Sequence, residues 1–314
     1  MKYYFLCSLS YLICGLNLVV NSIIVKKFGS EVFRSCMGVR YIIVGIIICF
    51  ISQVNSKWII KDKPTSKSIR HIHQIIACAA VTGFIEVGGF IYLNSKSLNY
   101  ISATYSSIGE QSIALLTFMF GLVFHKINPS WDINKEVKPT NMIFYLCGIS
   151  LLILNVCGDF DNLLGILLNI ASISCLALGG ILTKIICHQF DINVKFYGGV
   201  STLSGGILLL IVSCLQGNIP KATNLVIVGC LVYLITGSII TKVLVYTSLP
   251  HMNLVLMNML KILLMVIPIM YNSLILKDNF SLIEILSILL IILGAMPKEY
   301  YHRIKSALII KNSK

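Results

Sequence analysis

Long, almost uncharged stretches determine what this chain can fold into. Ten segments of about 20 residues carry few or no charges, and a helix of that length, rising roughly 1.5 Å per residue, crosses a hydrocarbon core of about 30 Å. The ten segments are residues 5–25, 35–54, 72–94, 102–124, 142–157, 163–187, 194–215, 224–247, 253–276 and 281–296. Only short loops remain between them. We therefore predict an all-α, polytopic membrane protein with ten transmembrane helices and no separate soluble domain.

The charged residues agree with this class and orient the helices. Only 12% of the 314 residues are charged, against about 25% in an average soluble domain. Most lysines and arginines outside the spans lie in the N-terminus, in loops on the same side of the membrane and in the C-terminal tail. The positive-inside rule then predicts that both termini are cytoplasmic, in a plasma membrane or a bacterial inner membrane. The net charge of +13 comes mostly from these loop lysines and arginines, which set the orientation of the helices in the membrane. We therefore expect a lipid bilayer around the chain and no nucleic-acid partner.

The sequence lacks the patterns of a metal or cofactor site. Its eleven cysteines include no Cys-x-x-Cys pair, and most lie inside apolar segments as small hydrophobic side chains. The histidines lie in a loop or near helix ends without an acidic cluster beside them. No glycine-rich phosphate loop or Ser/His/Asp arrangement is present. We expect no metal, no cofactor and no catalytic residues, and therefore not an enzyme.

The two halves of the chain align with each other. At an offset of 161 residues, Gly38 and Gly45 of the second span fall on glycines of the seventh, and at 151 residues the fourth span falls on the ninth. We predict a first five-helix repeat over residues 1–160 and a second over residues 161–314, within one membrane domain. Because five is odd, the second repeat enters the membrane inverted. Inverted repeats are typical of secondary transporters, whose site lies near the midplane.

Four short stretches are shared with a known family. They are Arg40-Tyr41 in the second span, Ser97-Leu98-Asn99-Tyr100-Ile101-Ser102-Ala103 after the third, Tyr246-Thr247-Ser248-Leu249 after the eighth, and Ile291-Ile292-Leu293-Gly294 in the tenth. In these stretches the chain resembles the drug/metabolite transporter superfamily, in its ten-helix EamA-like branch. The resemblance implies a transporter that exports or takes up small metabolites. That family often has a proline in the fourth and ninth helices and a Gly-Glu pair at their ends, and here only Pro268 is present.

A looser similarity concerns the nucleotide-sugar transporters of the same superfamily. It rests on Ala103-Thr104-Tyr105, on Lys184 before Leu203-Ser204-Gly205, and on Asn258-x-x-Lys261. This similarity implies that Lys261 faces a phosphate.

Two opposite charges fall near the middle of repeat-related spans. Glu110 lies about eight residues into the fourth span and Lys261 about eight residues into the ninth, so each is roughly 12 Å from its own end of the span. The two positions differ by the repeat offset of 151 residues. Ionisable side chains at such depth are costly and usually mark a functional site. We predict that both face one central cavity, with Glu110 also able to exchange a proton; the alternative is a buried ion pair that only orders two helices.

Five further side chains complete the predicted substrate site. They are Glu86, Arg40, Tyr105, Gln111 and Asn258. Glu86 lies among glycines and either lines the cavity or pairs with Arg40, which alternatively extends to the membrane surface. Lys184 and Lys242, by contrast, are expected to extend to the cytoplasmic surface.

These observations predict a secondary transporter for a small polar or amphipathic organic metabolite. We expect alternating access, coupled to protons or by exchange of one solute for another. A nucleotide-sugar-type antiporter is the alternative within transport. An intramembrane lipid-modifying enzyme would need acids and histidines clustered near one interface, and a receptor or scaffold would not need charges near the midplane. The expected partners are a small-molecule metabolite, the bilayer and protons, for a chain that acts alone or as a homodimer.

Overall fold

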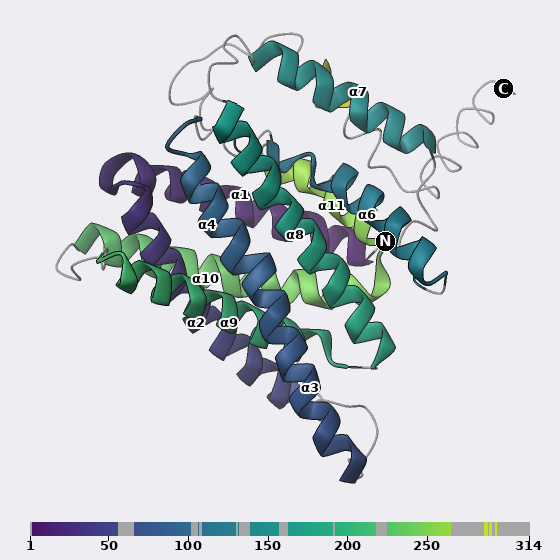
Figure 1. Cartoon of the computed structure of the whole chain (residues 1–314). Helices are drawn as coiled ribbons and strands as arrows, with labels where there is room; N and C mark the ends of the chain where they lie inside the picture. Colours follow the sequence, from purple (N-terminus) through teal and green to yellow (C-terminus); the bar gives the residue numbers. More distant parts are fainter. Residues whose placement is uncertain are drawn as a thin grey trace, which may run out of the picture.

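The regular elements are helices throughout the part of the chain that the computed structural model describes (Figure 1). That part comprises residues 2–55, 66–101, 106, 109–129, 131, 139–156, 163–190, 192–217, 225–264, 286–287, 289–290 and 293. The α-helices are α1 (Lys2–Phe28), α2 (Ser30–Asn55), α3 (Ser66–Gly83), α4 (Phe90–Ser97), α6 (Ile113–Ile127), α7 (Pro139–Val156), α8 (Leu163–Gln189), α9 (Val194–Leu215), α10 (Leu225–Ser248) and α11 (Leu254–Met259). One π-helix, η1 (Phe84–Gly89), and two 3₁₀ turns, η2 (Leu249–His251) and η3 (Leu260–Ile262), complete the series.

Several helices have the length and composition that a membrane span needs. Among the described residues, five apolar stretches qualify: Ser30–Gln53, Ile72–Ser97, Leu163–Gln189, Val194–Leu215 and Leu225–His251. They match the second, third, sixth, seventh and eighth predicted spans. Helix α1 covers the first span, α6 and α7 cover parts of the fourth and fifth, and most of the ninth and tenth lies outside the described residues.

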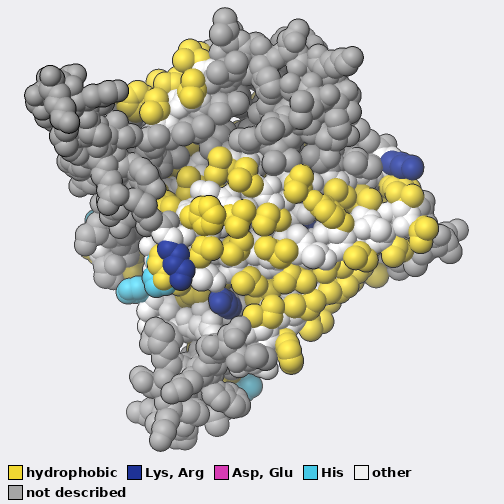
Figure 2. All heavy atoms as spheres, turned by 180° about the vertical axis from the view of Figure 1, so that it is seen from behind, with side chains coloured by type: hydrophobic (Ala, Val, Ile, Leu, Met, Phe, Trp, Pro, Cys, Tyr) yellow, Lys and Arg dark blue, Asp and Glu magenta, His cyan; other side chains and the backbone are white. Residues whose placement is uncertain are grey.

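The outward surface of these helices is apolar. In the described part of the face shown in Figure 2, hydrophobic side chains form a broad area, and lysine, arginine and histidine side chains lie at its margins. Large apolar side chains such as Phe50, Leu215 and Leu225 are mostly exposed, at 67%, 82% and 85%. Water would penalise such a surface and lipid would not. The chain is therefore an integral, multi-pass membrane protein.

Helices α2 and α9 cross at four glycines. These are Gly38 and Gly45 of α2 and Gly199 and Gly206 of α9. A Cβ atom added at Gly45 would lie 2.6 Å from the backbone nitrogen of Leu203. One added at Gly206 would lie 2.7 Å from the backbone nitrogen of Ile42. Because a later position on α2 faces an earlier one on α9, the two helices run antiparallel, backbone against backbone.

The third predicted span forms a single helical stack with an irregular middle. Helix α3 continues through η1 into α4, and the stack packs against α8 and α9. Side chains larger than hydrogen would not fit at two contacts: a Cβ at Gly83 would collide with the carbonyl of Ser201, and one at Gly179 with the Cβ of Glu86. The wide π-turn and the facing glycine of α8 thus place Glu86 against the middle of the bundle.

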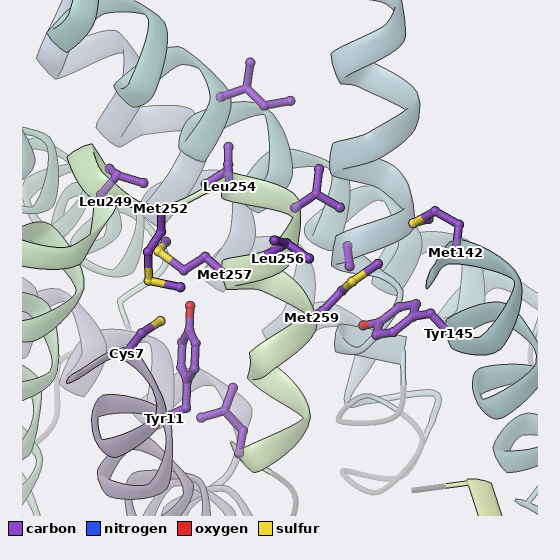
Figure 3. Close-up of a cluster of buried hydrophobic side chains, with 14 of the residues drawn as sticks. Cys7, Tyr11, Met142, Tyr145, Leu249, Met252, Leu254, Leu256, Met257 and Met259 are labelled. Atoms are coloured by element: carbon purple, nitrogen blue, oxygen red, sulfur yellow. The ribbon is translucent and has the colours of Figure 1, made fainter. Parts of the chain in front are cut away.

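The largest apolar core in the described part of the chain joins the N-terminal helix α1 to segments of the second half. Side chains of α1, α7 and α11 meet there, as Figure 3 shows for Cys7, Tyr11, Tyr145, Met257 and Met259. All five are buried, and three of them are fully inaccessible. This core fixes α11, and with it η3, against α1 and α6.

Candidate functional site

Five ionisable side chains from five different segments gather inside the helices. They are Arg40 of α2, Glu86 of η1, Glu110 just before α6, Lys242 of α10 and Lys261 of η3, and we call them the central charge cluster. Cys14 of α1 lies within reach of the charges of every member except Glu86. Lys261 in turn lies within the field of both acids and of Lys242. The cluster therefore surrounds one region next to α1.

Glu86 and Lys242 form the ion pair of the cluster. Lys242 Nζ lies 3.9 Å from Glu86 Oε1, and both side chains are largely buried, at 21% and 13% exposure. Lys242 Nζ also donates to the hydroxyl of Tyr246 at 3.2 Å and lies over its ring. Our expectation that Lys242 extends to the membrane surface is therefore wrong, because a carboxylate and a phenol hold its ammonium group inside.

Glu110 belongs to a hydrogen-bonded chain of polar side chains. Asn94 Nδ2 of α4 donates to Glu110 Oε1 at 3.1 Å, and Asn94 Oδ1 accepts from Ser106 Oγ at 2.8 Å. Ser106 Oγ accepts in turn from Asn169 Nδ2 of α8 at 2.9 Å. This chain ties the carboxylate to α4 and α8 and fixes its position.

Lys261 lies apart from these bonds. Within the described ranges, its ammonium group has no hydrogen bond and no carboxylate within 4.0 Å. Glu110 and Lys261, predicted to share a cavity, thus lie close enough for their charges to interact but do not form a contact ion pair. Their separation leaves the ammonium group of Lys261 available to a third partner.

Arg40 is the most deeply buried member, with 4% of its surface exposed. Its Nε donates to Ser238 Oγ of α10 at 2.6 Å, and one terminal nitrogen donates to Met37 Sδ at 3.3 Å. The guanidinium also lies over the ring of Tyr41, 5.3 Å from its centroid. Of the predicted alternatives, neither a contact pair with Glu86 nor extension to the surface is observed.

The remaining predicted site residues lie in three different situations. Asn258 is buried and its Nδ2 donates to Thr117 Oγ1 of α6 at 2.8 Å, so it joins α11 to α6. Gln111 is buried next to Glu110, and its backbone carbonyl accepts a hydrogen bond from the Tyr145 hydroxyl. Tyr105 lies outside the described residues. The structure therefore places Asn258 and Gln111 in packing contacts beside the cluster.

Irregular backbone lies at or directly beside three of the five charges. Glu86 is on the π-helix η1, Glu110 is the last helical residue before the turn at residues 111–112, and Lys261 is on the 3₁₀ turn η3. We had expected unbroken helices at all three places. Irregular turns inside membrane helices are tolerated where the freed backbone is buried or lines a cavity, and they are frequent at functional sites. The breaks thus mark the same region as the charges.

Two buried groups escaped the sequence-based prediction. Asn94 was counted as the end of a span, and Arg34 as a residue at the membrane boundary. Arg34 is 1% exposed, donates from Nε to Ser95 Oγ at 3.1 Å and from one terminal nitrogen to Gln216 Oε1 at 2.5 Å, and lies over the Tyr92 ring. The signal that could have found both groups is that each is a polar residue within one helical turn of the end of a predicted span. No group of three metal-ligating side chains was found in the described ranges.

Comparison with known proteins agrees with the apolar, helical architecture. Residues 1–133 match the model of the EamA-like transporter family, which confirms the predicted resemblance over that part of the chain. No curated protein sequence matched the chain. A solved structure described only as "Crystal structure of protein" superposes with a TM-score of 0.61 at 12% identity, covering 91% of this chain and 95% of that one. That likeness is one of fold, and it extends through both halves.

Proposed function

We propose that this chain, with its EamA-like first 133 residues, is a secondary transporter for a small polar or amphipathic organic metabolite. Family membership of that part and the apolar helices support a membrane transporter of small metabolites. The observation that carries the proposal is the central charge cluster, because five ionisable groups inside apolar helices are costly unless they serve a cavity or a solute. Three of these groups come from the first half of the chain and two from the second.

Alternating access between two inverted five-helix halves, residues 1–160 and 161–314, is the proposed mechanism. The antiparallel crossing of α2 and α9 supports it, since the crossing glycines Gly38 and Gly199, and Gly45 and Gly206, are separated by the same 161 residues. Two equivalent helices related by a two-fold axis in the membrane plane would pack in this way. Glu110 and Lys261 follow the second offset of 151 residues.

Coupling is proposed to run through the same cluster. Glu110 or Glu86 would carry a proton, or one solute would exchange for another at the unpaired cations. Tyr105, Gln111 and Asn258 would complete the lining, and both termini would be cytoplasmic. The alternative, an ion pair that only orders helices, is weakened by the missing contact between Glu110 and Lys261.

Uptake into proteoliposomes tests this proposal. Purified protein is reconstituted, and accumulation of a labelled panel of amino acids, organic acids, amines and phosphorylated metabolites is measured with and without a proton gradient. We expect uptake of at least one class, reduced at least tenfold by Glu110→Gln and by Lys261→Met. Glu31→Gln, which alters an exposed acid of α2, is the matched control. Uptake of no class would overturn the transport function, and full activity of both variants would overturn the site.

A further inference from the structure

The charges of the cluster do not balance. Among the described residues the cluster contains three cations and two acids, and its single ion pair within 4.0 Å joins Lys242 to Glu86. Glu110 is bound by Asn94 at 3.1 Å. Both acids are thus partnered, whereas two of the three cations have no carboxylate. An excess positive charge in apolar surroundings is costly until an anion joins it.

Arg40 has the geometry of an anion-binding group. A guanidinium presents five N–H donors in a planar fork that matches a carboxylate or a phosphate. Here the neutral Ser238 hydroxyl takes one of them and the Met37 sulfur, a weak acceptor, takes another. The side chain is only 4% exposed, and the structure gives its other donors no acceptor among the described residues. Arg34, also buried, has two side-chain oxygen acceptors instead of one.

Lys261 is the second cation that could bind an anion. It is partly buried on η3, its ammonium has no partner among the residues that the structure describes, and Arg40 and Lys261 both act on the same residue, Cys14 of α1. They reach this region from opposite halves of the chain, through α2 and η3. Helices α2 and η3 both pack against α1, so Arg40 and Lys261 approach that helix from two elements, and one anionic group bound by both would complete both sets of donors.

We infer that the transported solute is an organic anion, whose carboxylate or phosphate group is held between Arg40 and Lys261. The inference rests on the proposed transport function and names its substrate class. One excess negative charge on the solute neutralises the cluster, because the described members sum to one positive charge. An amine would meet three cations here, with Glu86 already paired with Lys242 and one oxygen of Glu110 bound by Asn94. The ion pair of Glu86 and Lys242 remains in place and positions α10 against η1.

Binding to the purified full chain in detergent tests this inference with matched probes. Lactate, succinate, glycerol 3-phosphate and UDP-glucose represent carboxylates and phosphates; lactamide, alanine and ethanolamine represent a neutral, a zwitterionic and a cationic solute. Thermal stabilisation is measured over a concentration series at constant ionic strength. We expect stabilisation by at least one anion, and none by lactamide, alanine or ethanolamine. Comparing the carboxylate probes with the phosphate probes shows which of the two anionic groups the chain binds.

Variants connect binding to the two cations. Arg40→Gln and Lys261→Met should each weaken anion binding about ten- to hundredfold, because each removes a charge-assisted hydrogen bond. Arg34→Gln is the matched control, since it removes another buried arginine of the same helix away from the cluster. If Arg40→Gln does not fold, Arg40→Lys keeps the charge without the fork and should still weaken binding.

The outcomes separate this inference from the transport function. Stabilisation by no anion, or by ethanolamine or lactamide in preference, overturns the substrate class, and so does unaltered anion binding in both cluster variants. Uptake of a neutral or cationic solute into proteoliposomes would then show that the chain is a transporter of another class. Uptake of no solute would overturn the transport function itself.

Discussion

Two buried arginines of one helix have opposite surroundings. Arg34 and Arg40 are six residues apart on α2 and are 1% and 4% exposed. Arg34 is bound by side-chain oxygens of Ser95 and Gln216, which join α2 to α4 and to the end of α9. Arg40 has one oxygen acceptor, Ser238, and lies within the central charge cluster. One terminal nitrogen of Arg34 is also buried without a hydrogen-bond partner, so neither burial nor acceptors alone distinguish the two arginines; the charged side chains that gather around Arg40 do.

The largest difference should appear in transport. We expect Arg40→Gln to lower the uptake rate about a hundredfold or more, because the solute loses its principal charged partner. Arg34→Gln should leave the substrate affinity within about threefold of wild type. Initial rates over a range of solute concentrations in proteoliposomes measure both. Equal losses of affinity in the two variants would remove the distinction.

Stability should rank the two arginines in the reverse order. Arg34→Ala removes two hydrogen bonds that join three helices and leaves Ser95 and Gln216 to find other partners, which costs about 1–3 kcal/mol. Arg40→Gln removes a charge without a counter-ion and should cost less. Unfolding of the detergent-solubilised chain by heat or by denaturant measures the difference. A greater loss in Arg40→Gln would show that Arg40 is the structural member of the two.

Neutralising Glu86 tests whether the net charge around Arg40 sets the affinity for an anion. Glu86→Gln releases Lys242 from its ion pair and raises the positive excess of the cluster, so we expect anion binding to strengthen by roughly three- to tenfold. The exposed acid Glu31, changed to glutamine on the same helix as both arginines, should have no effect. Weaker anion binding in Glu86→Gln alone would indicate that the carboxylate itself contacts the solute.

The smallest effect is expected at Asn258. Its amide is bound to Thr117 in a buried contact between α11 and α6, so Asn258→Ala should cost about 1 kcal/mol of stability. Thr117→Val, which removes the other partner, should have a similar cost, and the double variant should cost less than the sum. Solute affinity should remain at the wild-type value in all three. A tenfold loss of affinity in Asn258→Ala would restore the predicted contact with substrate.

The apolar pattern predicted the helices better than it predicted what their side chains touch. A run of about 20 uncharged residues has few structural solutions in lipid, so the bounds of α2, α8, α9 and α10 lie within a few residues of prediction. The repeat offset likewise predicts that Glu110 and Lys261 lie in one region, and in the structure each is within the field of the other. Both results follow from one-dimensional patterns that the chain alone contains.

Side-chain partners depend on how each helix is rotated, which the sequence does not specify. Lys242 was expected at the surface because it is near a span end, but Glu86 on η1 faces it. The π-turn itself has no strong sequence signal beyond the glycines that surround Glu86. Arg34 directly precedes the predicted span of residues 35–54 and was counted outside it, but acceptors from α4 and from the end of α9 hold it inside the protein.

The glycine crossing of α2 and α9 also limits the path that a solute can follow. Backbone lies against backbone at Gly45 and Gly206, which leaves no width for a passing molecule between these two helices. For the proposed transporter, a permeation route would therefore run along the opposite side of α2. Arg40 lies two residues from Gly38, about 200° around the helix at 3.6 residues per turn, and so lies beside that route. The close contact between α2 and α9 thus leaves Arg40 on the side of α2 that is open to a solute.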